Sequence, residues 1–147
     1  MIKLLSIYRE MEKQDSYKVL YDLHSEVEPV EAISHKKMPP FEQHKAFVSS
    51  KPYQYWYFIY AGENIVGSIL LTHEHKPRTN PNVRYREVGI RIFKKYQHMG
   101  FGSDAIQELR RLHPGRMLAN INPENKNSQR FFKKLGAKPL QVTYELP

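Results

Sequence analysis

The sequence contains no cysteine and no long apolar run. Without cysteine it offers no disulfide framework, no thiolate metal site and no cysteine nucleophile, and nothing in it points to an oxidising compartment. The longest apolar run, at residues 55–60, is far too short to span a bilayer, and residues 1–13 lack the apolar core and cleavage site of a signal peptide. We therefore expect a cytoplasmic protein that has no membrane partner.

Acidic side chains are scarce in one part of the chain only. Residues 1–90 carry 12 basic and 11 acidic side chains, whereas residues 91–138 carry 11 and 3 and hold the excess behind the net charge of +8. A basic half of this kind suggests a polyanionic partner, either nucleic acid or a small molecule that bears phosphate groups. Composition does not choose between these partners, and a basic face that serves only solubility explains the charge as well.

Internal repeats, linkers and low-complexity tracts are also missing, so the 147 residues predict one domain over 1–147. Hydrophobic periodicity predicts a mixed α/β fold, a sheet with helices on its faces. Strands are expected at 2–8, 53–60, 65–72, 84–93, 117–121 and 140–146, and helices at 14–24, 41–48, 103–112 and 123–135. In the last helix, Asn122 is expected to cap the first turn and Gly136 to end it.

Two of these strands carry a pattern that bears on function. Residues 84–93 alternate, with Val88, Ile90 and Ile92 on the side that should be buried. Residues 53–60 are almost entirely aromatic and β-branched, which favours packing in the sheet core. The same aromatic block beside a basic surface is also compatible with a platform on which nucleic-acid bases stack.

A glycine-containing segment between a strand and a helix has the form QxxGxG. Glycines there let the backbone turn tightly and approach a ligand, and the free N–H groups at the helix start would bind an anion such as a pyrophosphate. A plain strand-to-helix turn is the competing interpretation, and neither a dinucleotide fingerprint nor a Walker loop is present. The segment is Gln97, His98, Met99, Gly100, Phe101, Gly102 and Ser103, and Lys94, Lys95 and Arg110 would add positive charge.

These residues resemble a known family. The runs EVGIRIF at 87–93 and YQHMGFG at 96–102 resemble motif A of the GNAT superfamily of acyl-CoA N-acyltransferases. Downstream, NPENKNS at 122–128 and FFKKLGA at 131–137 are similar to motif B of the same family. The resemblance covers roughly residues 53–146, and it leans toward the branch of ribosomal-protein N-terminal and amino-sugar acetyltransferases.

The resemblance implies a fold and a reaction. The fold would be a six- or seven-stranded mixed sheet, splayed where coenzyme A binds. The reaction would move an acetyl group from acetyl-CoA to a primary amine by direct attack, which agrees with the missing cysteine nucleophile. The acceptor could be a protein N-terminus, an amino sugar or another small amine, and a homodimer is compatible with the family.

The resemblance also implies roles for individual residues. Ile90 and Ile92 would offer backbone groups to the pantetheine arm and the thioester, and Asn125 and Ser128 would contact that arm or hold the motif B helix against it. The backbone amides of the loop would hold the pyrophosphate; they belong to Gln97, His98, Met99, Gly100, Phe101, Gly102 and Ser103.

Glu87 is the candidate general base, because it begins the strand that would reach the acetyl group and could take the amine proton through a water. A salt bridge or a direct contact with the substrate amine is the alternative role. The position of the tyrosine that serves as the acid in many family members holds Phe132, so Tyr96 is a candidate acid, with Tyr85, Tyr144 and solvent as substitutes.

His73 and Tyr85 are candidate substrate contacts near the expected mouth of the site. His73 and His75 form a His-x-His pattern without further ligands at metal spacing, so no metal is predicted. Two alternatives to the enzyme stay open: a basic protein associated with nucleic acid, for which the charge and the aromatic block would speak, and a catalytically silent fold that binds coenzyme A, which Phe132 would suit.

Overall fold

The computed structural model describes residues 1–147 except 12, 14, 29–36 and 77–82. Its described strands form one mixed sheet in the order β1-β2-β3-β4-β5, antiparallel from β1 to β4 and parallel between β4 and β5. The strands are β1 (Ile2–Ser6), β2 (Tyr55–Ala61), β3 (Asn64–Leu71), β4 (Arg86–Ile92) and β5 (Met117–Leu118). The mixed α/β fold predicted from the sequence is confirmed.

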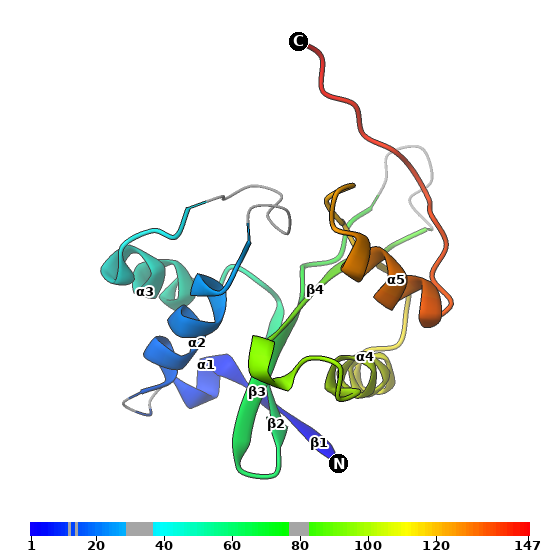
Figure 1. Cartoon of the computed structure of the whole chain (residues 1–147). Helices are drawn as coiled ribbons and strands as arrows, with labels where there is room; N and C mark the ends of the chain where they lie inside the picture. The colour runs from blue at the N-terminus through cyan, green and yellow to red at the C-terminus, as the bar shows by residue number, and fades with distance from the viewer. Residues whose placement is uncertain (12, 14, 29–36, 77–82) are drawn as a thin grey trace.

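Helices cover both faces of this sheet (Figure 1). The first three helices lie on one side, and α4 and α5 lie on the other. The helices are α1 (Ile7–Glu10), α2 (Ser16–Ser25), α3 (Phe41–Ser49), α4 (Phe101–Leu112) and α5 (Lys126–Lys134), and a short 3-10 turn, η2 (Lys94–Tyr96), follows β4. The chain thus builds two cores, one on each face.

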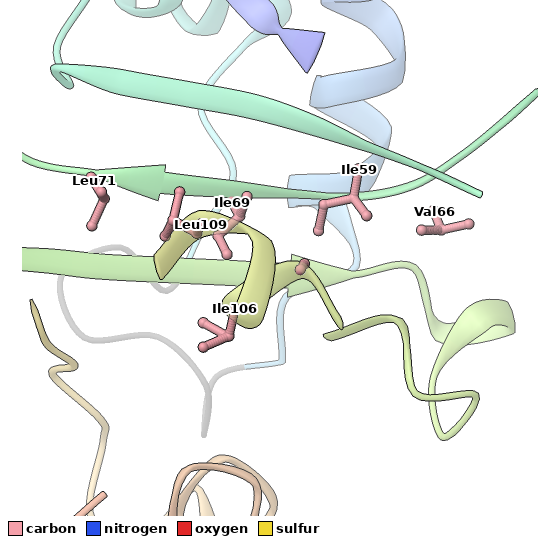
Figure 2. Packing of buried hydrophobic residues seen from close by; sticks show 7 residues of the cluster. Ile59, Val66, Ile69, Leu71, Ile106 and Leu109 are labelled. Atoms are coloured by element: carbon pink, nitrogen blue, oxygen red, sulfur yellow. The ribbon is translucent and has the colours of Figure 1, made fainter. Parts of the chain in front are cut away.

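The core on the α4 face joins β2 and β3 to one stripe of α4. Figure 2 shows Ile69 and Leu71 of β3 beside Ile106 and Leu109 of α4, and this cluster is almost fully buried. Val88, Ile90 and Ile92 pack against it, as their alternation along β4 predicts. The opposite side of β4, which carries Glu87, Gly89 and Arg91, therefore faces α2.

The core on the other face contains the aromatic block. Trp56 and Phe58 are 1% and 0% exposed and pack with buried residues of α2 and α3. These are Leu20, Leu23 and Val48. Because Trp56 and Phe58 are enclosed by protein, they are not available for base stacking, and the interpretation as sheet packing holds for them.

Three predicted strands differ markedly from the structure. The strand predicted at 2–8 ends at Ser6, because Ile7 turns into the core and starts α1. The strand predicted at 117–121 covers only Met117–Leu118. The segment 140–146 forms no strand at all, and Leu140 and Tyr144 are 59% and 85% exposed. Its alternation supplies an apolar face but no partner for its backbone, and no described strand pairs with it. The described sheet therefore has five strands instead of the six or seven predicted.

The last helix begins later than predicted. Asn125, not Asn122, is its cap, because the Asn125 side-chain oxygen accepts a hydrogen bond from the Ser128 N–H (3.1 Å). Asn122 instead accepts from the Glu124 N–H (3.0 Å) and closes a local turn before the helix. The other late helix, α4, ends as predicted, but Leu112 is 40% exposed because the buried cluster stops one turn earlier, at Leu109.

Candidate functional site

The sheet opens between β4 and β5. The two strands pair only at Arg86 with Met117 and at Glu87 with Leu118. Beyond this point β4 continues to Ile92 with β3 on one side and, among the described strands, no partner on the other. In an antiparallel pair, alternate residues turn their backbone groups away from the partner strand, so those of Val88 and Ile90 face away from β3 and can bind an extended ligand along that edge. Ile90 and Ile92, the predicted contacts for a pantetheine arm, lie on this stretch, where the Ile92 carbonyl already accepts a hydrogen bond from the protein.

The loop after β4 turns at Gly100. This residue adopts the left-handed conformation with φ 85° and precedes the first turn of α4. A Cβ added there would meet nothing within 4 Å, so it is the backbone conformation and not crowding that favours glycine. His98 also has a positive φ of 63°, which is uncommon for a residue with a side chain.

Gly102 has a different role from Gly100. A Cβ added at Gly102 would lie 3.2 Å from Cε2 of Phe131, a residue of α5. The absence of a side chain thus lets the start of α4 pack closely against α5. The structure explains one glycine of the motif by a turn and the other by helix packing.

The first turn of α4 leaves backbone N–H groups without acceptors. The Asp104 N–H donates to the Gly100 carbonyl (3.1 Å), which is the first bond of the helix ladder. No side chain in the described part of the chain caps the helix start. The N–H groups of Phe101, Gly102 and Ser103 therefore face outward at the positive end of the helix dipole. Outward-facing N–H groups of this kind can bind an anion, and the pyrophosphate site at this loop stays a prediction.

Side chains of the preceding turn hold the loop in place. The Gln97 side-chain amide donates to the Ile92 carbonyl (3.1 Å), which ties the loop to the end of β4. Lys94 donates from Nζ to Glu28 (2.6 Å), and the Lys95 Nζ lies 5.1 Å from the centre of the Tyr96 ring. Arg110 is in the last turn of α4, about 14 Å from the helix start at 1.5 Å per residue.

Glu87 lies where the sheet opens. Its N–H donates to the Thr72 hydroxyl (2.9 Å), and its carbonyl accepts from the Thr72 N–H (3.0 Å), so its backbone is fixed. Its side chain points to the face of α2, opposite to Val88. Among the described residues, the carboxylate has no hydrogen-bond or salt-bridge partner. It is therefore free to accept a proton from a molecule that approaches from that face.

Tyr96 is far from Glu87. Its ring packs on Phe101 (6.3 Å between ring centres), at the end of β4 that leads into the loop. The stretch of strand from Glu87 to Ile92 alone spans about 17 Å at 3.3 Å per residue. The structure does not bring the candidate acid and the candidate base together. Phe132, which offers no hydroxyl, packs edge-on against Phe131 at 5.0 Å.

The predicted substrate contacts lie near Glu87, at the other end of β4 from the loop. Tyr85 pairs with His75 through two backbone hydrogen bonds (2.7 and 3.2 Å), and their rings stack at 5.0 Å. The Arg116 guanidinium lies over the Tyr85 ring, 5.9 Å from its centre. His73 is exposed at the end of β3. The ring of Tyr85 is thus engaged by protein, whereas His73 is open to solvent.

Asn125 and Ser128 are brought together at the start of α5. Their hydrogen bond shows that Asn125 caps this helix. That the two residues contact a pantetheine arm, or hold the helix against it, stays a prediction. Both residues are half-buried. Ser128 lies one turn before Phe131 and Phe132, so the first turn of this helix is polar and the next turn carries the two aromatic rings.

Sequence reasoning missed a cluster of buried rings on the α2 face. His24 stacks on Trp56 (5.9 Å between ring centres) and meets the edge of His44 at 5.3 Å. Burial, with smaller contributions from the charges of His44 and Arg91, lowers the pKa of His24 to about 3. Burial also lowers the pKa of His44, whose Nε2 has no hydrogen-bond partner. The only signal in the sequence was that both histidines share a helix face with apolar residues.

A second missed cluster lies at the far end of α4. The Tyr57 hydroxyl and Nε2 of His113 form a hydrogen bond of 2.6 Å, and the Tyr55 ring stacks on His113 at 3.8 Å. Burial, and then the charge of Arg86, lower the pKa of His113. Because His113 ends α4 and the tyrosines belong to β2, this cluster fixes the helix on the sheet.

In the described part of the chain, no three side chains of the metal-binding types gather closely enough to hold an ion. None of the helices in that part of the chain has the length and apolar character needed to cross a membrane.

A family model for the acetyltransferase (GNAT) domain matches residues 7–138. The chain belongs to the GNAT acetyltransferase family. Similar folds occur among solved structures, although no curated protein sequence matches the chain. A transcriptional regulator from Bacillus halodurans is 14% identical with a TM-score of 0.67, and the match covers 100% of this chain and 98% of that one.

Two further GNAT-like structures carry acetyltransferase names. An aminoglycoside acetyltransferase from an uncultured soil metagenomic sample, in complex with sisomicin, is 12% identical with a TM-score of 0.67 over 100% of this chain and 95% of that one. An acetyltransferase from Trypanosoma brucei is 14% identical with a TM-score of 0.62 over 100% and 98%. At these identities the likeness supports the fold and leaves the substrate open.

Proposed function

We propose that this GNAT protein transfers an acetyl group from acetyl-CoA to a primary amine. One observation supports the proposal: a loop that turns at Gly100 joins the start of α4 to the edge of β4 that pairs with no described strand. Coenzyme A combines a pyrophosphate with an extended pantetheine arm. The helix start suits the pyrophosphate and the strand edge suits the arm, so the two halves of the ligand match two adjacent features.

The residues that would hold acetyl-CoA follow from this match. The backbone of residues 97–103 would bind the pyrophosphate, and the backbone groups of Ile90 and Ile92 would bind the arm. Asn125 and Ser128 would support the arm from the start of α5. Lys95 would add positive charge near the phosphates, whereas Lys94 is engaged by Glu28.

Glu87 would serve as the general base. Acetyl-CoA supplies an acyl group activated as a thioester. The acceptor must lose a proton from its ammonium group before its nitrogen can attack, and the free carboxylate of Glu87 can take that proton through a water. The carbon–nitrogen bond forms as the carbon–sulfur bond breaks. Because Phe132 has no hydroxyl and Tyr96 lies at the other end of β4, we assign the proton for the leaving thiolate to solvent.

The acceptor would be a small-molecule or peptide amine that approaches from the α2 face. Glu87 points to this face, and His73 lies exposed nearby, at the end of β3. One similar structure is an aminoglycoside acetyltransferase in complex with sisomicin. That likeness supports a small amine as one class of acceptor to be screened first.

Binding of nucleic acid is the second candidate function. Arg110 and Arg111 line an open depression of about 370 Å³ at the end of α4 that is remote from the coenzyme loop. The aromatic block no longer supports this function, because Trp56 and Phe58 are buried. Basic side chains at a helix C-terminus also complement the helix dipole, so acetyl-CoA binding is the stronger proposal.

Calorimetric titration with acetyl-CoA at low and moderately high salt tests the proposal, with a short DNA duplex and an RNA as parallel ligands. We expect micromolar binding of acetyl-CoA that changes little with salt, whereas binding to a phosphate backbone would fall by orders of magnitude. Salt-sensitive binding of nucleic acid without binding of acetyl-CoA would refute the enzyme and favour the second candidate.

Gly100→Asp should abolish acetyl-CoA binding, because it places a negative side chain at the helix start where the pyrophosphate would lie. Gly62→Asp is the matched control. Gly62 also has a positive φ, 62°, and open space around it, but it lies in the hairpin turn between β2 and β3. Both variants place an aspartate at a positive φ, so equal acetyl-CoA affinities in the two would contradict the assignment of the loop.

A further inference from the structure

A carboxylate from α2 reaches the start of the coenzyme loop. Oε1 of Glu26 accepts a hydrogen bond from the backbone N–H of Lys94 at 2.7 Å. Glu26 is the C-cap residue that follows α2, and Lys94 is the first residue of η2, directly before the loop. The two residues are 68 positions apart in the sequence. Two faces of the protein are thus joined at one backbone amide.

The Lys94 amide needs an acceptor from outside its own turn. The first N–H groups of a helical turn have no partner within it, and the side chain of Phe93, which precedes η2, makes no capping bond. Glu26 therefore caps η2 from a distant part of the chain. Its own position is firm, because Leu20 and Leu23 anchor α2 in the core with 0% exposure.

Hydrogen bonds link the position of Lys94 to that of the loop. The Lys94 carbonyl accepts from the Gln97 N–H at 3.3 Å, and the Gln97 side chain is bound to the carbonyl of Ile92. Gln97 is the first residue of the QxxGxG segment. A shift of Lys94 would therefore move both the turn and the first residue of the segment that leads to the helix start.

We infer that Glu26 is a positioning residue for coenzyme binding: by holding the Lys94 amide, it sets the loop in the geometry that accepts the pyrophosphate. This inference rests on the proposed function, which assigns that loop to acetyl-CoA. It also makes α2 part of the site, since the same helix covers the sheet face to which Glu87 points.

The direction in which the acetyl-CoA affinity changes when Glu26 is removed distinguishes a positioning role from a purely electrostatic one. A carboxylate near an anion site repels the anion, so if charge were its only influence, removal of Glu26 would tighten acetyl-CoA binding. Positioning predicts the opposite result. Glu26→Ala, which loses the acceptor, should weaken binding about tenfold, the scale of one hydrogen bond to a charged group. Glu26→Gln keeps an acceptor oxygen and should stay within about twofold of the native affinity.

Glu28→Ala is the matched control. Glu28 binds the side chain of Lys94, not its backbone, and both partners are about half exposed, at 55% and 53%. Loss of this ion pair should leave the acetyl-CoA affinity within about twofold. Thermal unfolding of each variant shows whether the fold survives.

Hydrogen exchange of the Lys94 amide gives a readout that needs no coenzyme. Exchange should become at least about tenfold faster in Glu26→Ala and stay near native in Glu26→Gln, because only the first variant loses the acceptor. Unchanged exchange, or acetyl-CoA binding in Glu26→Ala that equals or exceeds the native affinity, would overturn the inference. So would an equal loss in Glu28→Ala or in Glu26→Gln. A native protein that binds no acetyl-CoA, with exchange as expected, would instead overturn the proposed function and leave the Glu26–Lys94 link intact.

Discussion

Mild acid should destabilise this protein through His24. The imidazole is packed against Trp56 and the edge of His44, at ring distances of 5.9 and 5.3 Å, and its pKa is lowered to about 3. In the unfolded chain a histidine titrates near 6.5. Between these two values the unfolded state takes up a proton that the folded state does not, so stability is complete above about pH 6.5 and declines as the pH falls toward 3.

The loss can be worked out at any pH in this window. At pH 5, 1.5 units below the unfolded pKa, His24 alone should cost about 2 kcal/mol of the free energy of unfolding, at 1.36 kcal/mol per unit. His44 acts in the same direction, because burial lowers its pKa as well. The combined effect is a large share of the stability of an ordinary domain, which is about 5–15 kcal/mol.

Urea unfolding at pH 7.5, 6.5, 5.5 and 5.0 measures this loss. The range ends at pH 5 so that the carboxyl groups with lowered pKa, Glu28 and Glu108, remain ionised. His24→Phe keeps a flat ring against Trp56 but removes the titrating group, so its stability should depend less on pH than that of the native protein, by about 2 kcal/mol over the range. His73→Gln changes an exposed histidine and should keep the native slope. A native slope in His24→Phe would refute the reasoning.

Two further predictions concern the site itself. Glu87→Gln should lower turnover at least about 100-fold while the affinity for acetyl-CoA stays within about twofold, because a general base acts on the amine and not on the coenzyme; steady-state kinetics with calorimetry checks this, and normal turnover would remove Glu87 as the base. Gly102→Val should lower the free energy of unfolding by about 1–3 kcal/mol, since its side chain would meet the Phe131 ring. Urea unfolding should show that Gly102→Val lowers the free energy of unfolding less in a Phe131→Leu background than in the native protein. An equal cost in both backgrounds would show that the clash is elsewhere.

Local backbone features of the fold could be predicted from the sequence. Gly100 lies at a turn and adopts the left-handed conformation that favours glycine, and the helix predicted at 41–48 is found at Phe41–Ser49. The alternation of β4 placed Val88 and Ile90 on the correct core. In each case a residue type encodes a backbone conformation or a face, and neither depends on a distant partner.

Contacts between distant segments could not be predicted. Nothing in the spacing of residues shows that Glu26 caps a turn at Lys94, or that His24 stacks on Trp56, because periodicity identifies the side of an element and not what meets it. The segment 140–146 shows that periodicity also does not tell whether a partner strand exists. Its alternation is as regular as that of β4, yet the structure gives it no strand to pair with. The candidate site was therefore predicted as a backbone loop, while its supporting side chains were not.

The contact between Gly102 and Phe131 has a mechanical consequence. With no side chain at Gly102, the start of α4 rests directly on the aromatic stripe of α5, so there is no slack between the two helices at that point. A displacement of α5 toward α4 would therefore press on the turn that bears the outward-facing N–H groups. If this loop binds the coenzyme as proposed, substitutions on the aromatic stripe of α5 should change the affinity without touching the ligand.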